Sequence, residues 1–365
     1  MRLRVVVLGR SVCGCAFPGG SPEGSFAPRP PAPPFMPASA PLSLARLRAG
    51  TADADLLFAA QSSAAAEGPP SLNWLPYRIP TEKPLLRLFC FPWAGASASA
   101  YAIWQRRFVK GQLDDGVTAV PDGPDDDGEL ARVELCAVQM PGREHRASEA
   151  PYTDLRLAAR EFVRDCFELL TTCRVAFFGH GCGAWMAYEV ALELRRHGAK
   201  DPVLLVVSNW PAPQTPVNAR PWRKSAALDN EELIREGRMW GWPEHVFKEE
   251  FWPHIEPVVR RDLAFFDTYE PSGVDEPLSC PIVAYVSQDD PKLGPRRGTP
   301  EFLEAWARLT TRMHMEVEVF NGDHYYLQDA ALRHKVAKSV ARRIGDIAAL
   351  LADYADEEEK EEGAL

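Results

Sequence analysis

The chain has 365 residues and a formal net charge of −10, and 46% of its residues are hydrophobic, which indicates a globular protein with one large core or two modest ones. The acidic balance argues against nucleic acid as a partner, because phosphate binding needs a positive surface. No stretch of the sequence reaches the ~20 apolar residues of a transmembrane helix. The eight cysteines show neither CxxC pairs nor zinc spacing, which indicates reduced thiols and no metal site.

Residues 1–78 differ in composition from the rest of the chain. Proline, alanine, glycine and serine dominate, and the first fifty residues contain several arginines and a single acid, Glu23. This low-complexity, acid-poor segment is typical of an organelle transit peptide; the alternatives are a disordered extension or a mispredicted gene start. The apolar run at residues 5–8 is too short for a signal-peptide core. We therefore expect a cytoplasmic protein, or one in a plastid or other organelle if the extension is a transit peptide.

Strand patterns and helix patterns alternate along a domain that is expected to span residues 84–352. Strands are expected at 85–91, 133–138, 174–178, 203–208, 282–287 and 315–320. Helices are expected at 100–110, 155–170, 184–197, 300–309 and 329–351. The segments that depart from this alternation are an acidic loop at 111–130, a helical segment at 210–270 and an acidic tail at 353–365.

This alternation predicts an α/β fold, in which a mostly parallel sheet is flanked by helices on both faces. The catalytic groups of such sheets lie just beyond the carboxyl ends of the strands. The chain segments that follow residues 178, 287 and 320 are therefore the places where an active site is expected.

The segment after residue 178 has the glycine spacing of a nucleophile elbow. A buried strand runs into the sequence Gly-His-Gly-Cys-Gly at 179–183, and a helix follows. Strand, G-x-S-x-G turn and helix form the elbow of α/β-hydrolases, where glycines permit a close approach of backbone. Gly181 stands where the attacking serine is expected, so the frame of a hydrolase is present without its usual nucleophile.

Two polar residues follow later strands in the order that this fold uses for its acid and base. Asp290, with Asp289 as the neighbouring alternative, comes three residues after Ser287, and His324 lies in a glycine turn after Phe320. Hydrolases of this fold supply nucleophile, acid and base in this chain order. The alternative is that both are polar residues of surface turns; the elbow upstream favours the catalytic interpretation.

The oxyanion hole of such a site uses two backbone N–H groups. One comes from the residue after the nucleophile position, here Cys182, and one from the loop after the first strand of the domain. In that loop the candidates are Trp93 and Ala94, among small residues that let backbone approach an acyl carbonyl. The alternative is an ordinary flexible loop.

Read together, these segments resemble the type II thioesterases of polyketide and non-ribosomal peptide synthesis. The loop 88–101 is similar to their first-loop signature, and Val-Gln-Met-Pro-Gly-Arg-Glu-His-Arg at 138–146 is close to their "VQxPGRExR" segment. Phe-Gly-His-Gly-Cys-Gly-Ala at 178–184 matches "FGHSMGA" except at two positions. The segments 289–291 and 322–324 are similar to the acid and base segments, and the resemblance covers about residues 84–350.

The resemblance implies an α/β-hydrolase that removes acyl groups from acyl carrier protein or coenzyme A. It implies no bound cofactor, since the substrate carries its own phosphopantetheine arm. It also implies a helical lid at 210–270, whose tryptophans are candidates to line an acyl channel: Trp222, Trp240, Trp242 and Trp252. The alternative is that they pack the lid onto the core. We expect a monomer that docks an acidic carrier through local basic residues, with these candidates: Arg106, Arg107, Arg143, Arg146, Arg220, Arg223 and Lys224.

The main departure from the family is Gly181, since an acyl-enzyme cannot form on a glycine. Cys182 is an alternative nucleophile, but it lies one position late, and a buried, inert thiol is the default interpretation. His324 could instead activate a water, which leaves slow hydrolysis available. Two hypotheses remain open: a thioesterase with impaired activity, and a catalytically dead homologue that binds acyl carriers as a regulator.

Overall fold

The computed structural model describes residues 2–7, 69–110, 132–271, 276–291, 293 and 300–362. The chain divides into two compact units, and the unit considered below comprises Met1–Leu8 and Pro69–Leu365. The predicted acidic loop at 111–130 and most of the predicted extension lie outside the described residues.

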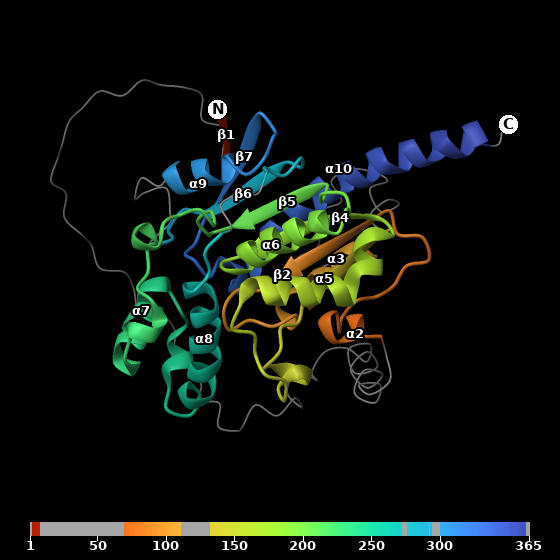
Figure 1. Ribbon diagram of the computed structural model, residues 1–365. Helices are drawn as coiled ribbons and strands as arrows, with labels where there is room; N and C mark the ends of the chain where they lie inside the picture. Colours follow the sequence, from red (N-terminus) through yellow and green to blue (C-terminus); the bar gives the residue numbers. More distant parts are fainter. Residues whose placement is uncertain are drawn as a thin grey trace, which may run out of the picture. The chain divides into compact units, whose positions relative to one another are not determined.

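A seven-stranded parallel sheet forms the centre of this unit, in the order β1-β7-β6-β5-β4-β2-β3 (Figure 1). The strands are β1 (Arg2–Val7), β2 (Leu86–Phe91), β3 (Val133–Ala137), β4 (Arg174–His180), β5 (Leu204–Ser208), β6 (Ile282–Ser287) and β7 (His314–Phe320). Strands β2, β3, β5 and β6 are buried along their whole length, as expected for strands covered on both faces. The predicted α/β fold with a mostly parallel sheet is confirmed.

Two structural features lie in the segment that composition assigned to a low-complexity extension. Strand β1 pairs in parallel with β7, from Arg2 beside His314 to Val7 beside Val319. The short helix α2 (Ser71–Trp74) buries Trp74 in the core. The ordered domain therefore includes residues before 84, and the pairing partner of β1 lies too far along the chain for composition to reveal it.

Helices cover both faces of the sheet, and the side chains of each strand alternate between two cores. In β2, Phe89 and Phe91 face one core, whereas Leu88 and Cys90 face the other. The first core receives α5 (Leu155–Thr171), α6 (Gly183–Arg196) and α9 (Pro300–Ala307). The second core receives α3 (Ser99–Lys110) and α10 (Ala330–Glu362).

Helix α10 contains the apolar stripe that the sequence predicts and extends beyond it. Val336, Val340 and Ile344 are fully buried against the sheet, as their spacing predicts. The helix continues to Glu362, so residues 353–362 of the segment predicted as a separate acidic tail belong to it. In the described ranges, every helix is too short or too polar to cross a lipid bilayer.

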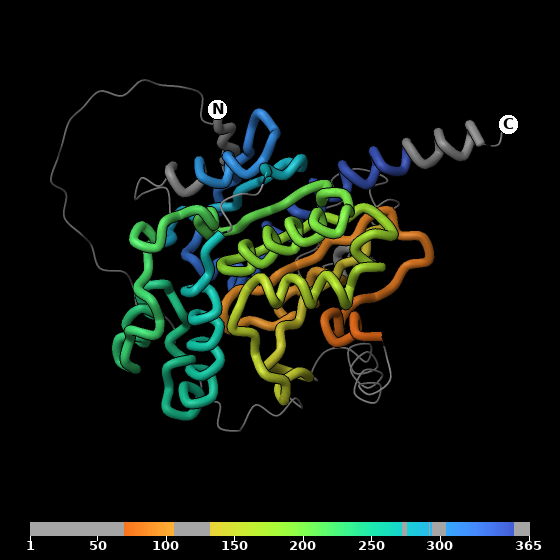
Figure 2. Tube along the Cα trace, in the orientation of Figure 1, coloured from red at the N-terminus to blue at the C-terminus, as the bar shows by residue number. Residues whose placement is uncertain are grey.

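The helical segment at 210–270 lies beside the carboxyl ends of the strands, where Figure 2 shows it in green and teal. It contains α7 (Asn230–Trp240) and α8 (Trp252–Asp267). Asp229 starts α7 with a capping box, and Gly241 ends it in the left-handed region with φ 86°. This segment, called the lid below, has its own small hydrophobic cluster around Leu233 and Trp252.

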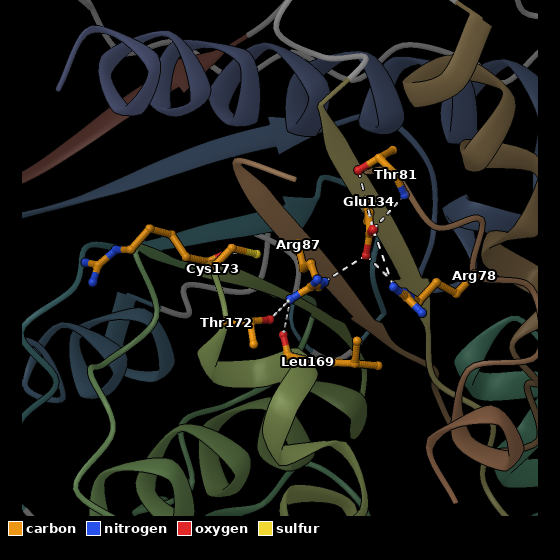
Figure 3. Close-up of polar contacts among 8 residues, drawn as sticks. Arg78, Thr81, Arg87, Glu134, Leu169, Thr172 and Cys173 are labelled. Carbon is orange, nitrogen blue, oxygen red and sulfur yellow. Dashed lines mark hydrogen bonds and ion pairs between the residues drawn. The ribbon is translucent and has the colours of Figure 1, made fainter. Parts of the chain in front are cut away.

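A buried carboxylate joins the two strands at the β3 edge of the sheet (Figure 3). Glu134 accepts hydrogen bonds from Arg78 Nε at 2.9 Å, Arg87 Nε at 2.7 Å and the Thr81 N–H at 2.8 Å. Arg87 also donates to Thr172 Oγ1, at the end of α5, at 2.6 Å. Burial alone would raise the pKa of Glu134, but these hydrogen bonds outweigh it and lower the pKa below its usual value.

We expect Glu134→Gln to lower the free energy of unfolding by about 3–5 kcal/mol, because it leaves two arginines without their buried counter-charge. Since the folded-state pKa of Glu134 lies below its unfolded value, its stabilisation is present above pH ~4.3 and is lost as the pH falls further. Urea unfolding between pH 3 and 7 measures both effects. Glu304→Gln, at an exposed position of α9, is the control and should change stability by less than about 0.5 kcal/mol.

Candidate active site

The turn between β4 and α6 has the backbone of a nucleophile elbow. Gly181 adopts φ +54°, in the left-handed region. Its N–H donates to the Ser208 carbonyl at 2.9 Å, and its own carbonyl accepts from the Ala184 N–H at 3.0 Å. A Cβ on Gly179 or on Gly183 would collide with neighbouring backbone, so both flanking glycines are sterically required.

Residue 181 faces the base predicted from sequence. An ideal Cβ built on Gly181 would lie 3.8 Å from Nε2 of His324 and 3.2 Å from Cβ of Trp93. A side chain at this position would therefore place its next atom within reach of the imidazole. The glycine occupies the geometric position of a nucleophile and lacks only the attacking atom.

Asp290 and His324, which are 34 residues apart in the chain, meet at this turn. Nδ1 of His324 lies 2.7 Å from Oδ2 of Asp290, and both side chains are buried. The other oxygen of Asp290 accepts the Leu293 N–H at 2.7 Å, which fixes the carboxylate. With Nδ1–H donated to Asp290, the neutral imidazole presents the lone pair of Nε2 toward residue 181, as a general base requires.

A second histidine, His180, packs against the first. Its ring centroid lies 5.4 Å from that of His324, and its Nδ1 lies 2.8 Å from Oγ of Ser208. Burial lowers the pKa of His180 well below its usual range, and the nearby His324 lowers it further. His180 is therefore neutral at physiological pH and adds no charge next to the base.

The predicted oxyanion residues Trp93, Ala94 and Cys182 line the same pocket as Gly181 and His324. Ala94 follows β2 and Cys182 is the N-cap residue of α6, so the two residues reach this pocket from different elements. Cys182 also stands at the start of α6, where N–H groups have no partner within the helix. Backbone N–H groups at these two positions are the ones that an oxyanion hole of this fold would use.

The thiol of Cys182 is protonated and is therefore poorly suited to attack a thioester. It is buried, and this burial raises its pKa well above the usual value; the carboxylate of Asp262 raises it further. A protonated thiol is a weak nucleophile. These observations favour the inert-thiol interpretation of Cys182 over its role as an alternative nucleophile.

A tryptophan-rich pocket with a volume of about 50 Å³ opens beside the turn. Trp210 and Trp222 stack with ring centroids 4.5 Å apart, and the ring of Trp240 lies 4.6 Å from that of His324. Trp242 also lines the pocket. An aromatic, mostly apolar lining of this kind suits the burial of an acyl group.

Trp252, the fourth tryptophan predicted for the channel, lies elsewhere. It packs in the lid cluster, and its Nε1 donates to Asn230 Oδ1 at 3.0 Å. It is absent from the pocket lining, so its prediction as a channel residue is corrected. The reason is its place at the start of α8, where its ring joins α8 to α7 instead of facing the elbow.

The lining residues that sequence reasoning did not assign include Trp210, Phe266 and Tyr325. Trp210 follows the end of β5, so the rule that sites lie beyond strand ends could have identified it. Two of the predicted docking arginines, Arg146 and Arg220, are buried, and Arg143 is half-buried. All three are engaged within the chain.

The side chains of Arg106 and Arg107 lie outside the described residues, whereas Arg223 and Lys224 are exposed beside the pocket. Among the described residues, no three His, Cys, Asp or Glu side chains gather in a way that could hold a metal ion.

Comparison with known proteins identifies the same region. A family model described as "Thioesterase domain" matches residues 128–348, which include the elbow, Asp290 and His324. The chain is 33% identical to the gramicidin S biosynthesis protein GrsT of Aneurinibacillus migulanus over 247 residues, 67% of this chain and 84% of that protein. It is 27% identical to the medium-chain S-acyl fatty acid synthase thioesterase of Homo sapiens over 251 residues, 67% of this chain and 82% of that protein.

Solved structures show the same fold. RedJ, a thioesterase from the prodiginine biosynthetic pathway in Streptomyces coelicolor, is 30% identical with a TM-score of 0.57, covering 72% of this chain and 94% of that one. BorB, the type II thioesterase from the borrelidin biosynthetic cluster, is 28% identical with a TM-score of 0.56, covering 74% of this chain and 96% of that one.

We expect iodoacetamide at pH 8 to modify Cys182 at least about tenfold more slowly than Cys173, because burial keeps the Cys182 thiol protonated and covered. Cys173 is half-buried and serves as the internal reference. Mass spectrometry of proteolytic peptides measures both rates in one sample. Faster modification of Cys182 than of Cys173 would show a reactive thiolate and reopen its role as a nucleophile.

Proposed function

The chain belongs to the thioesterase family, and we propose that it hydrolyses acyl thioesters carried by acyl carrier protein or coenzyme A. Its relatives serve gramicidin S, prodiginine, borrelidin and fatty acid biosynthesis. We propose an editing role in which the protein clears acyl groups from carriers in such a pathway. We further propose that turnover is impaired, because Gly181 stands at the position of the serine.

One observation supports this proposal above the others. The pair Asp290–His324 is intact and buried at 2.7 Å, and its free nitrogen faces residue 181. Burying a carboxylate and an imidazole costs free energy unless they are paired, and their pairing here is oriented toward the elbow. A site that served only to bind acyl carriers would gain nothing from this orientation.

In the proposed reaction, a water molecule replaces the serine hydroxyl as the nucleophile. Nε2 of His324 takes one proton from the water while the water oxygen attacks the thioester carbonyl carbon. The π electrons move onto the carbonyl oxygen, beside the N–H groups of Ala94 and Cys182. When the tetrahedral intermediate collapses, the C–S bond breaks, and the leaving thiolate takes the proton from His324. The products are a carboxylic acid and the thiol of the carrier arm, and no cofactor takes part.

Direct attack by water is slower than attack by a positioned serine. A triad that loses one member keeps about 10³-fold catalysis over water through binding and its oxyanion hole. The glycine that removes the nucleophile also favours the second hypothesis, in which the protein binds acyl carriers as a regulator. The two hypotheses differ in whether acid is released at a rate that depends on His324.

We expect Gly181→Ser to raise kcat for acyl-carrier hydrolysis at least about 10³-fold, because it restores a hydroxyl within reach of Nε2 of His324. His324→Ala should abolish the hydrolysis of both forms. The assay measures free thiol released from acylated carrier protein and from acyl-coenzyme A. Gly198→Ser is the matched control: residue 198 has φ +75° and no atom within 4 Å of a built Cβ, so it adds similar backbone strain far from the base.

Acid release by the unaltered protein that persists in His324→Ala would contradict the proposed mechanism. No release by the unaltered protein, together with retained binding of acyl carrier protein, would support the regulatory hypothesis instead.

A further inference from the structure

The loop that supplies the Ala94 amide is held on one side by the segment 139–146. Gln139 Oε1 accepts the Ala98 N–H at 3.1 Å, and Arg143 donates to the Ala96 carbonyl at 2.8 Å. Glu144 Oε1 accepts from Oγ of Ser99 at 2.5 Å. Three side chains of the segment 139–146 thus hold Ala96, Ala98 and Ser99 of the loop. These contacts explain why the segment has polar side chains at those three positions.

The lid holds the same loop from the other side. Asp262 of helix α8 accepts the Gly95 N–H at 2.7 Å. The same carboxylate receives both terminal nitrogens of Arg143, at 2.5 and 2.7 Å. The two side chains are only 9% and 12% exposed, so solvent screens this bidentate pair weakly.

These bonds act on the peptide group next to the predicted oxyanion donor. Gly95 has φ +80°, a conformation that glycine adopts readily and other residues adopt with strain. A Cβ on Gly95 would lie 3.1 Å from Val259 Cγ2, so α8 and the loop are in direct contact. Holding the Gly95 N–H fixes the orientation of the Ala94–Gly95 peptide plane, which adjoins the peptide group that carries the Ala94 N–H.

The pair also lies close to the site of charge development. Leu263 and Phe266, which follow Asp262 on α8, line the same pocket as Ala94, Gly181 and Cys182. The lid, the loop and the elbow therefore meet around one small volume beside Gly181.

We propose that Arg143 and Asp262 are positioning residues, forming a latch through which the docked lid helix α8 aligns the oxyanion loop. The inference rests on the proposed function, since an oxyanion donor matters only to a protein that performs acyl chemistry. When α8 is docked, the loop receives its acceptor for the Gly95 N–H and its anchor for the Ala96 carbonyl together. When α8 moves away and takes Asp262 with it, the Gly95 N–H loses its acceptor. Arg143 then still faces the loop, but it has no counter-charge.

The first experiment measures the loop without any ligand. Amide hydrogen exchange of the full-length protein should be about tenfold or more faster at residues 94–99 in Asp262→Ala, because a hydrogen bond to a charged acceptor is lost. Asp262→Asn, which keeps an acceptor but not the charge, should give a smaller increase. Glu256→Gln breaks an ion pair with Arg260 on the same helix and is the matched control, with unchanged exchange in the loop.

The second experiment measures catalysis in the Gly181→Ser background. Asp262→Ala should lower kcat about 10- to 100-fold with little change in KM, since a misplaced oxyanion donor weakens the transition state more than the bound substrate. Glu256→Gln should leave both constants unchanged. If Asp262 contributed only to stability, Asp262→Ala would reduce the amount of folded protein. The folded protein would then show no specific loss of kcat.

The outcomes separate the latch from the proposed function. Unchanged loop exchange in Asp262→Ala overturns the latch, whatever the activity. Faster loop exchange with unchanged kcat also overturns it, because the loop would then be held without positioning the donor. If Gly181→Ser shows no hydrolysis although Asp262 is intact, the proposed function fails, and the exchange measurement alone still decides whether α8 holds the loop.

Discussion

The left-handed backbone at residue 181 is the constraint around which the rest of the site is arranged. Three backbone features impose it: the end of β4, the start of α6 and the hydrogen bond from the Gly181 N–H to Ser208 on β5. None of them uses a side chain of residue 181. The elbow therefore keeps its shape when serine is replaced by glycine, and glycine adopts φ +54° with less strain than serine does. The frame of a hydrolase can survive the loss of its nucleophile without a cost in folding.

The remaining groups reach this turn because parallel strands end at one edge of the sheet. Strands β6 and β7 deliver Asp290 and His324, and β2 delivers the loop that contains Ala94. The lid completes the site from the open side with its tryptophan rings and with Asp262. Dyad and lid thus remain organised around a position that has no side chain, which is why we interpret the molecule as a slow thioesterase rather than a passive carrier-binding protein.

Short-range patterns predicted the frame well. The strand and helix alternation, the glycine spacing at 179–183 and the strand-end position of His324 were sufficient to predict the fold and the meeting of acid, base and elbow. Contacts that depend on three-dimensional packing were not predictable. Composition placed β1 in a low-complexity region, although it pairs with a strand about 300 residues later. Trp252 was grouped with the channel because tryptophans in one segment look alike in sequence, and Asp262 had no local signal at all.

Intact-mass spectrometry after mixing with an acylated carrier tests the central claim most directly. We expect the unaltered protein to release free acid without ever gaining the mass of an acyl group. We expect Gly181→Ser to gain that mass, on a peptide that contains residue 181. An acyl adduct on Cys182 of the unaltered protein would show a covalent nucleophile and would rule out direct attack by water as the main route, although burial raises the pKa of the Cys182 thiol.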